Sequence, residues 1–260
     1  MQTKENKMGV MPIDKLLISM SLPMMISMLV QALYNIVDSI FVSRINEYAL
    51  RAVSLAFPIQ SLMIAVAVGT AVGINAFLSK TLGEKDFEKA DIIAKNGIFL
   101  AIASYVAFAV IGLLVSRPFF ASQTEVLEVR EYGVTYLTIC CVAGMGIFLQ
   151  TTFERLLQAT GKTFYTMITQ GTGAVINIIL DPILIFGLLG FPGMGVKGAA
   201  VATVIGQISA FLLYIVVYLR KNPGVTIHPK YLHLDWQLIR QIYSVGIPSS
   251  LMMTMPSVLG

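Results

Sequence analysis

Apolar residues fill most of this chain in long stretches that short polar segments separate. A bilayer-spanning helix needs roughly 20 mainly apolar residues. Six stretches meet this length: Leu16–Val42, Val53–Leu78, Ile92–Val115, Gly133–Gln150, Tyr165–Leu189 and Val196–Leu219. A seventh stretch begins near Ile242. The pattern predicts an all-α integral membrane protein, and the first stretch is too long for a signal peptide.

The composition excludes a water-soluble domain. The residues are 56% hydrophobic and 12% charged, and the mean hydropathy is +0.79, whereas a soluble domain carries about 25% charged residues. The sequence pI near 9.0 raises the question of a nucleic-acid partner. We expect none, because the basic residues are scattered among connectors and form no stripe with interleaved aromatic residues. The lipid bilayer is the expected surrounding.

The distribution of lysine and arginine predicts the orientation. Thirteen of the 18 basic residues lie at the N-terminus or by the connectors after spans two, four and six, and five lie by the other connectors. Cytoplasmic loops carry the excess of basic residues. We therefore predict a multi-pass protein of the cytoplasmic membrane with its N-terminus in the cytoplasm. Lys80, Lys85, Lys89 and Lys95 are expected on the same side.

The chain also begins to repeat itself. Residues 240–248 match residues 15–23 in pattern, with Ser19 and Pro23 falling on Ser244 and Pro248. Six spans separate the two copies, so both have the same orientation, as in the parallel repeats of some transporters. We expect a cytoplasmic N-terminus (1–15), a six-helix N-terminal lobe (16–220), a cytoplasmic inter-lobe linker (221–241) and a truncated seventh transmembrane helix (242–260).

Two acidic residues carry the strongest functional signal. Of 14 Asp and Glu residues, only Asp38 and Asp181 lie well within apolar runs. A charged side chain in the membrane costs at least a few kcal/mol, so such residues usually face the interior of a bundle and mark an ion or proton pathway. This placement favours a transporter.

Each of these aspartates belongs to a polar stripe at helical spacing. The stripe in span one comprises Gln31, Tyr34, Asn35 and Asp38, and the stripe in span five comprises Gln170, Gly173, Asn177 and Asp181. Pro23 is expected to kink the first helix, which suits a moving gate. Pro182 is expected to loosen the fifth helix and free carbonyl groups for an ion. The candidates for gating or for lining a substrate cleft are Pro23, Gln31, Tyr34, Asn35 and Gln170.

The predicted orientation places Asp38, Asp181, Tyr136 and Thr203 in the outer half of the membrane, so that they can share one cavity. Burial disfavours a charged carboxylate, and a second carboxylate nearby disfavours it further, so such a pair can exchange protons near physiological pH. The same oxygens also suit a small cation, with Na⁺ at Asp38, Asn177 and Asp181. The alternative is that both aspartates only form hydrogen bonds with neighbouring helices. We expect no cofactor beyond the coupling ion.

Two further pairs of neighbouring residues have simpler interpretations. Cys140 and Cys141 are adjacent in an apolar run, where a disulfide between them is disfavoured, so we expect two buried thiols. Glu154 and Arg155 lie near the cytoplasmic end of span four and are expected to be interfacial partners.

Five segments resemble the multidrug and toxic compound extrusion (MATE) family: Ser21–Pro23, Tyr34–Asp38, Leu82–Lys85, Asn177–Pro182 and Gly198–Thr203. The resemblance implies the N-terminal lobe of a transporter with twelve spans in two six-helix lobes, which exchanges H⁺ or Na⁺ for organic, often cationic, compounds. It also implies a cation site at Asp38, Asn177 and Asp181, with Tyr136 and Thr203 as further members, and bending of the first helix at Pro23. The expected partners are small organic cations and the missing C-terminal lobe or a second copy.

Three alternatives remain at this stage. A lipid-linked sugar flippase of the same superfamily is expected to need Lys or Arg deep in its spans, and none lies there. An intramembrane enzyme needs a catalytic constellation, yet His228 and His233 lie in a polar connector, so we expect no enzyme. A non-transporting half-transporter fragment is the third alternative. The sequence leaves the choice between H⁺ and Na⁺ open, as well as the substrate and the oligomeric state.

Overall fold

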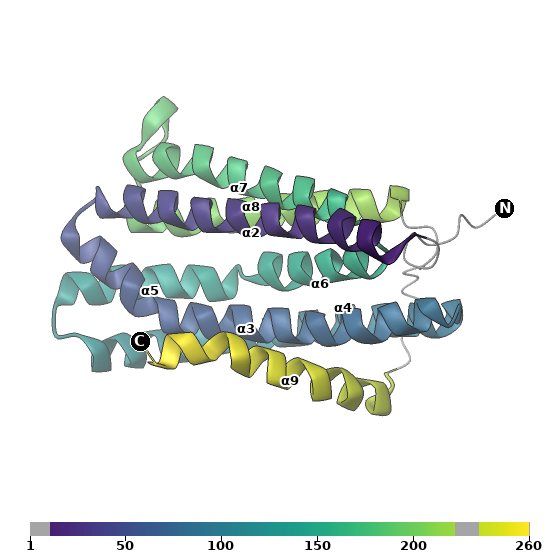
Figure 1. Cartoon of the computed structure of the whole chain (residues 1–260). Helices are drawn as coiled ribbons and strands as arrows, with labels where there is room; N and C mark the ends of the chain where they lie inside the picture. Colours follow the sequence, from purple (N-terminus) through teal and green to yellow (C-terminus); the bar gives the residue numbers. More distant parts are fainter. Residues whose placement is uncertain (1–10, 222–233, 260) are drawn as a thin grey trace.

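The computed structural model describes residues 11–221 and 234–259. Within these ranges the chain is helical and contains no strand (Figure 1). His228, His233 and most of the expected linker lie outside the described residues. The helices are α2 (Ile13–Ser43), α3 (Glu47–Gly83), α4 (Phe87–Gln123), α5 (Leu127–Val142), α6 (Met145–Ala159), α7 (Thr163–Phe186), the short 3-10 helix η1 (Leu188–Gly190), α8 (Val196–Lys221) and α9 (Trp236–Leu259).

The helices match the apolar stretches of the sequence. Among the described residues, five helices are long and apolar enough to cross a membrane, and the bent pair α5 and α6 provides a sixth span. The prediction of an all-α membrane protein is confirmed. Helix α9 is not among these candidate spans, so a seventh span stays a prediction. The longest helices, α3 and α4, have 37 residues each, or about 55 Å at the α-helical rise, so their ends project beyond a hydrocarbon core of about 30 Å.

The predicted fourth span is broken in the middle. Helices α5 and α6 meet at Ala143 and Gly144 with a bend of 44°. A Cβ atom at Gly144 would lie only 2.7 Å from the carbonyl oxygen of Cys140, so glycine lets the chain turn tightly at this point. Both Cys140 and Cys141 are buried free thiols, as expected.

The helices run side by side along one axis, so the connectors gather at the two ends of the bundle (Figure 1). One end holds the start of α2, the α3–α4 connector and the α6–α7 connector. It carries Lys80, Lys85, Lys89 and Lys162, and we call it the basic end. The opposite end holds the α2–α3, α4–α5 and α7–α8 connectors, and we call it the far end.

Small residues bring two helix pairs into close contact, as in other membrane bundles. Between α7 and α8, a Cβ atom at Gly173 would lie 2.8 Å from the Cβ of Ala210 and 3.1 Å from the carbonyl oxygen of Gly206. Between α3 and α9, Gly69 and Gly246 face each other. Ser250 Oγ on α9 donates a hydrogen bond of 2.9 Å to the carbonyl oxygen of Ala65. These contacts set α7 against α8 on one side of the bundle and α9 against α3 on the other (Figure 1).

Candidate functional site

The two intramembrane aspartates meet near the far end of the bundle. Asp38 lies five residues before the end of α2, and Asp181 lies five residues before the end of α7. Helices α2 and α7 pack against each other, and the two carboxyl groups lie within hydrogen-bonding reach of one another. Asp181 is 0% exposed, whereas Asp38 is half-buried. The structure therefore brings the two residues of the sequence prediction into one place.

Each carboxyl group has an oxygen that its protein neighbours leave unsatisfied. The Oδ1 atoms of Asp38 and Asp181 are both buried and have no hydrogen-bond partner. A buried polar atom without a partner costs about 1–3 kcal/mol, and such orphans in a native fold call for an explanation such as an ion or a functional role. A proton shared by the two carboxyl groups, or a small cation between them, would satisfy both oxygens.

Asn177 connects Asp181 to α8. It lies one turn before Asp181 on α7 and is 3% exposed. With its amide nitrogen turned toward Asp181, Asn177 donates a hydrogen bond to Asp181 Oδ2 at 3.2 Å and accepts one from the backbone N–H of Thr203 at 3.1 Å. This orientation follows from the surrounding donors and acceptors. Thr203 on α8 in turn donates its hydroxyl to the carbonyl oxygen of Ala199 at 3.0 Å.

Glycines position this contact. A Cβ atom at Gly206 on α8 would lie 3.0 Å from the carbonyl oxygen of Gly173 and 3.1 Å from the Cβ of Asn177. Any larger residue at Gly206 would push α8 away from α7 at the level of the site. The sequence placed Gly173 in the polar stripe of span five, and the structure shows that it serves the packing of α7 on α8.

Two tyrosines lie near the aspartate pair. Tyr34 on α2 is half-buried and lies close enough to interact electrostatically with Asp38 and Asp181. Tyr136 on α5 is 3% exposed and acts in the same way on Asp38 and Tyr34. Residues of α2, α5, α7 and α8 thus form the site. These helices carry the four residues that the predicted orientation placed in the outer half of the membrane.

Sequence reasoning missed Gln60 on α3. Its Nε2 atom lies 3.3 Å from the hydroxyl oxygen of Tyr136 and 3.5 Å from Cys140 Sγ, as hydrogen-bond donor to both. Gln60 thereby fixes the tyrosine that faces Asp38. A signal was present, because Gln60 is an amide inside the apolar stretch of span two.

A second polar contact between α2 and α7 lies closer to the basic end. Gln170 Nε2 donates a hydrogen bond of 2.8 Å to Gln31 Oε1. Pro23 is buried two turns further toward the basic end, and α2 continues through it as one helix. Pro23 has no N–H for the carbonyl of Ser19, and Thr163 Oγ1 on α7 donates to that carbonyl oxygen at 3.4 Å. Neighbouring hydroxyls commonly satisfy such carbonyls in membrane helices.

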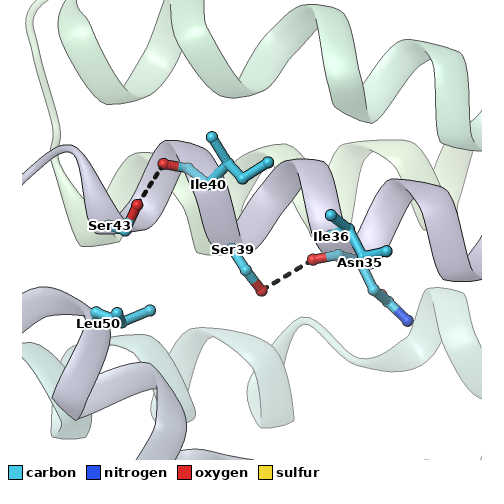
Figure 2. A pocket seen from close by; sticks show the side chains of 6 residues that line it. All are labelled: Asn35, Ile36, Ser39, Ile40, Ser43 and Leu50. Carbon is cyan, nitrogen blue, oxygen red and sulfur yellow. Dashed lines mark hydrogen bonds between the residues drawn. The ribbon is translucent and has the colours of Figure 1, made fainter.

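Asn35 does not join the site, although the sequence placed it on the same face of the helix. It is exposed and lines an open groove of about 410 Å³ together with Ile36, Ser39, Ile40, Ser43 and Leu50. Figure 2 shows the Asn35 side chain among these groove residues, with Ser39 Oγ donating to the Asn35 carbonyl oxygen at 2.9 Å. At about 100° per residue, Asn35 lies about 100° around the helix from Tyr34 and about 60° from Asp38, so it is turned away from the contact with α7.

The donor set suits a proton or a hard cation. Asp38, Asp181 and Thr203 offer oxygen atoms, the ligands that hard cations prefer, and Asn177 would offer its amide oxygen only if the amide turned round. The described residues contain no group of three or more His, Cys, Asp and Glu side chains placed to hold a metal ion. The arrangement is therefore a pair of carboxyl groups with amide and hydroxyl neighbours.

Comparisons with known proteins show the family of this chain. The sequence profile of the MatE family matches residues 23–183. The chain is 32% identical over 253 residues to the multidrug export protein MepA of Staphylococcus haemolyticus, covering 95% of this chain and 54% of that protein. The chain thus spans about half the length of the curated relatives it matches.

Solved structures show the same fold. A multidrug resistance MATE family transporter of the MOP superfamily, in the outward-facing conformation, matches with a TM-score of 0.90 and 30% identity, over 98% of this chain and 56% of that one. A MOP superfamily transporter from Pyrococcus furiosus, whose binding pocket is described as having reverse polarity that suggests a different function, matches equally well, with a TM-score of 0.90 and 30% identity over 98% of this chain and 56% of that one.

Proposed function

This chain belongs to the MatE family, and from that premise we propose that it is the ion-coupled lobe of an antiporter that exports small organic, often cationic, compounds across the cytoplasmic membrane. The relative from S. haemolyticus is named as a multidrug export protein. The observation that carries the proposal is the contact between Asp38 and Asp181, each with a buried oxygen that lacks a partner.

The geometry favours a proton over Na⁺ as the coupling ion. Two carboxyl groups within hydrogen-bonding reach satisfy one another when one of them is protonated. In the amide orientation that best satisfies its neighbours, Asn177 donates its N–H to Asp181 and accepts from the backbone N–H of Thr203, so in that orientation it is a donor to the pair and not a ligand to a cation. Na⁺ at Asp38, Asn177 and Asp181 would require the amide to turn round.

Coupling follows from the charge of the pair. When both carboxyl groups are ionised they repel each other and lack solvation, so α2 is pushed away from α7. A proton that enters from the far end lets the two helices approach. Pro23, Gln31, Tyr34 and Gln170 lie on the surfaces that this movement changes, and we propose them as gating residues. Asn35 and its groove face the outside of α2 and are proposed only as part of a substrate cleft. That cleft needs a second lobe packed on this one, supplied by further chain or by a second copy.

The proposed orientation puts the basic end in the cytoplasm. Lys85 lies in the α3–α4 connector at the basic end, and Ser122 lies at the far end of α4; both are exposed. A membrane-impermeant thiol reagent is expected to label Ser122→Cys in intact cells and to label Lys85→Cys only after permeabilisation. The reverse pattern would overturn the orientation.

The test of the function is export of a fluorescent organic cation. This chain would be expressed alone, and also joined to the second half of the S. haemolyticus relative. We expect export by the joined protein, driven by an imposed pH gradient and not by an Na⁺ gradient. Asp38→Asn and Asp181→Asn should each abolish it, whereas Asp14→Asn, which changes an exposed acid at the start of α2, should not.

The other outcomes are equally informative. Export by the chain alone would mean that two copies form the cleft. Full export by both aspartate variants would refute the coupling role of the pair. Absence of export from every unsubstituted protein would favour a role outside drug transport.

A further inference from the structure

A third carboxyl group lies inside the bundle, toward the basic end, and the coupling site does not use it. Glu154 is on α6, five residues before the end of the helix, and is half-buried. The sequence pairs it with Arg155, but the structure does not: among the described residues no ion pair within 4.0 Å involves Glu154. Gln158 lies between the two charges instead.

Gln158 connects Glu154 to Arg155 in a short network. Gln158 Nε2 donates to Glu154 Oε1 at 2.8 Å, and Gln158 Oε1 accepts from Arg155 Nη1 at 2.8 Å. Gln158 is 4% exposed, and Arg155 Nε is buried without a partner, so the network lies within the protein and not at its surface. A structural ion pair would direct Arg155 at the carboxylate itself, because a guanidinium fork matches a carboxylate.

The charged or titratable groups that act on Glu154 come from two helices. They are Arg155 on α6 and Tyr214 on α8. The hydroxyl of Tyr214 is already engaged, donating to the carbonyl oxygen of Thr166 at 3.1 Å. Glu154 is thus a carboxylate with one amide donor and a cation close by but not in direct contact.

Gln150 lies one turn deeper on the same face of α6 as Glu154. Its Oε1 atom is buried and has no hydrogen-bond partner. Gln150 and Glu154 are half-buried, whereas most of α6 around them is buried. They form a polar stripe on a helix whose other faces pack against α3, α4 and α8.

The helical rise per residue places the Gln150–Glu154 stripe nearer to the basic end than the Asp38–Asp181 pair. Gln150 lies about 14 Å from the end of α6, and Gln170 lies about 10 Å from the start of α7 at 1.5 Å per residue. Helices α6 and α7 are antiparallel and joined by residues 160–162, so Gln150 lies near the level of the Gln31–Gln170 contact. Polar groups therefore occur at three levels: the aspartate pair near the far end, three glutamines in the middle, and Glu154 toward the basic end.

We propose that Glu154 is the inner proton-exchange site of this lobe, through which the coupling proton passes between the Asp38–Asp181 pair and the water at the basic end. The Glu154 carboxylate accepts the proton that the aspartate pair releases and becomes neutral. It then gives the proton to water at the basic end and becomes an anion again, held by the Gln158 amide. Arg155 favours this second step because its charge stabilises the anion. This inference rests on the proposed function as a proton-coupled antiporter.

The transport test uses the joined protein in proteoliposomes and varies the pH on the basic side. Glu154→Gln keeps the size of the side chain and its ability to bond Gln158, but it carries no proton. We expect turnover to fall by about tenfold or more, a typical contribution of a proton-transfer group, with an unchanged KM for the fluorescent cation. The dependence of the rate on the basic-side pH should disappear. Glu154→Asp should retain that dependence.

Glu88→Gln is the matched control, because Glu88 is an exposed carboxylate at the same end of the bundle, near the start of α4. It should behave as the unsubstituted protein. An unchanged rate and pH profile for Glu154→Gln would overturn the proposal. Loss of folding in Glu154→Gln, measured by thermal unfolding in detergent, would also overturn it and make Glu154 a structural residue.

A second measurement separates this inference from the proposed function. Infrared difference spectra between acid and alkaline pH would be recorded on the purified chain in lipid nanodiscs, where no transport is needed. A carboxylic acid shielded from water has a carbonyl band distinct from that of an exposed one. Glu154→Gln should remove one such band, and Glu88→Gln should not. If the joined protein fails to export but this band is present, the antiport proposal fails while Glu154 still exchanges protons; absence of the band overturns the inference itself.

Discussion

The two carboxyl groups of the coupling site belong to helices that are held very differently. Helix α7 packs along α8 through Gly173 and Gly206, and 39% of its most apolar stretch is buried inside the lobe. For α2 the corresponding value is 11%, and α2 packs mainly against α7. Asp181 is therefore fixed within the bundle, whereas Asp38 is carried by a helix at its edge.

This difference indicates which part of the lobe moves. A change of charge at the pair acts equally on both helices, but the helix with fewer buried contacts responds more readily. Besides the aspartate pair, the polar contacts of α2 with α7 include the Gln31–Gln170 hydrogen bond and the contact of Thr163 with the Ser19 carbonyl. Each is worth about 1 kcal/mol or less, so α2 is held in place by weak, separable interactions.

The largest expected effect comes from disturbing the fixed side. Gly173→Leu would force a side chain against Ala210, where even a Cβ atom would be 2.8 Å away. Overpacking of this kind costs about 1–3 kcal/mol and separates Asn177 from Thr203. We expect a lower thermal unfolding temperature in detergent and complete loss of export by the joined protein.

Gly171 offers a control on the same helix. A Cβ atom at Gly171 would have nothing within 4 Å, so Gly171→Leu should leave stability and export unchanged. Equal losses in the two variants would show that the glycine contact between α7 and α8 does not position the site.

The next effect distinguishes two asparagines that the sequence placed in polar stripes, Asn177 as a member of the cation site and Asn35 as a gating or cleft candidate. Asn177→Ala removes the donor to Asp181 Oδ2 and leaves a buried oxygen without a partner, at a cost of about 1–3 kcal/mol. Export driven by a pH gradient should fall by about tenfold, since 1.4 kcal/mol corresponds to that factor. Asn35→Ala, in the open groove that we propose as part of a substrate cleft, should keep the dependence of export on the pH gradient and change only the KM for the exported cation. Loss of the pH dependence in Asn35→Ala would mean that the groove belongs to the coupling site.

Much of this arrangement could be read from the sequence. The length of each apolar stretch fixes how far a residue lies from the end of its span, and the lysine distribution predicts the direction of each helix. Together they place Asp38, Asp181, Tyr136 and Thr203 at one depth, and in the structure these residues are neighbours. The resemblance to the MATE family, drawn from short motifs, is confirmed by the family match.

The depth of a residue in the membrane does not determine which residues its side chain contacts. Asn35 fits the polar stripe of α2 but faces the open groove, because a polar arc about 100° wide extends beyond the contact with α7. Gln60 reaches the site from α3, a helix whose acidic residue, Glu47, lies at its start and not within the apolar stretch. Adjacent opposite charges suggested a pair at Glu154 and Arg155, but neighbours in a helix point about 100° apart, and Gln158, one turn on from Glu154, bridges them.

A smaller effect measures how α2 is attached. Gln31→Ala and Gln170→Ala should each reduce stability, and the double variant should lose less than their sum, with a coupling energy of about 0.6 kcal/mol, typical of hydrogen bonds between membrane helices. Unfolding in detergent of the four proteins of the cycle would give this value. Combining Gln170→Ala with Asn35→Ala should show no coupling. An equally large coupling energy in that control pair would mean that the coupling energy between Gln31 and Gln170 does not come from their hydrogen bond.

The smallest expected effect tests the contact at Pro23. Thr163→Val removes the hydroxyl that donates to the Ser19 carbonyl at 3.4 Å, so it should destabilise the chain by about 0.5 kcal/mol. In a Pro23→Ala background the new N–H of residue 23 can bond the same carbonyl, and Thr163→Val should then have no effect. Thr172→Val is the control, because the Thr172 hydroxyl bonds within its own helix at Ile168. An equal loss in both backgrounds would show that Thr163 does not compensate for the proline. If Thr163→Val has no effect in the Pro23→Ala background, Pro23 is a hinge of α2. Its free carbonyl, that of Ser19, is then held by α7, the helix that also carries Asp181.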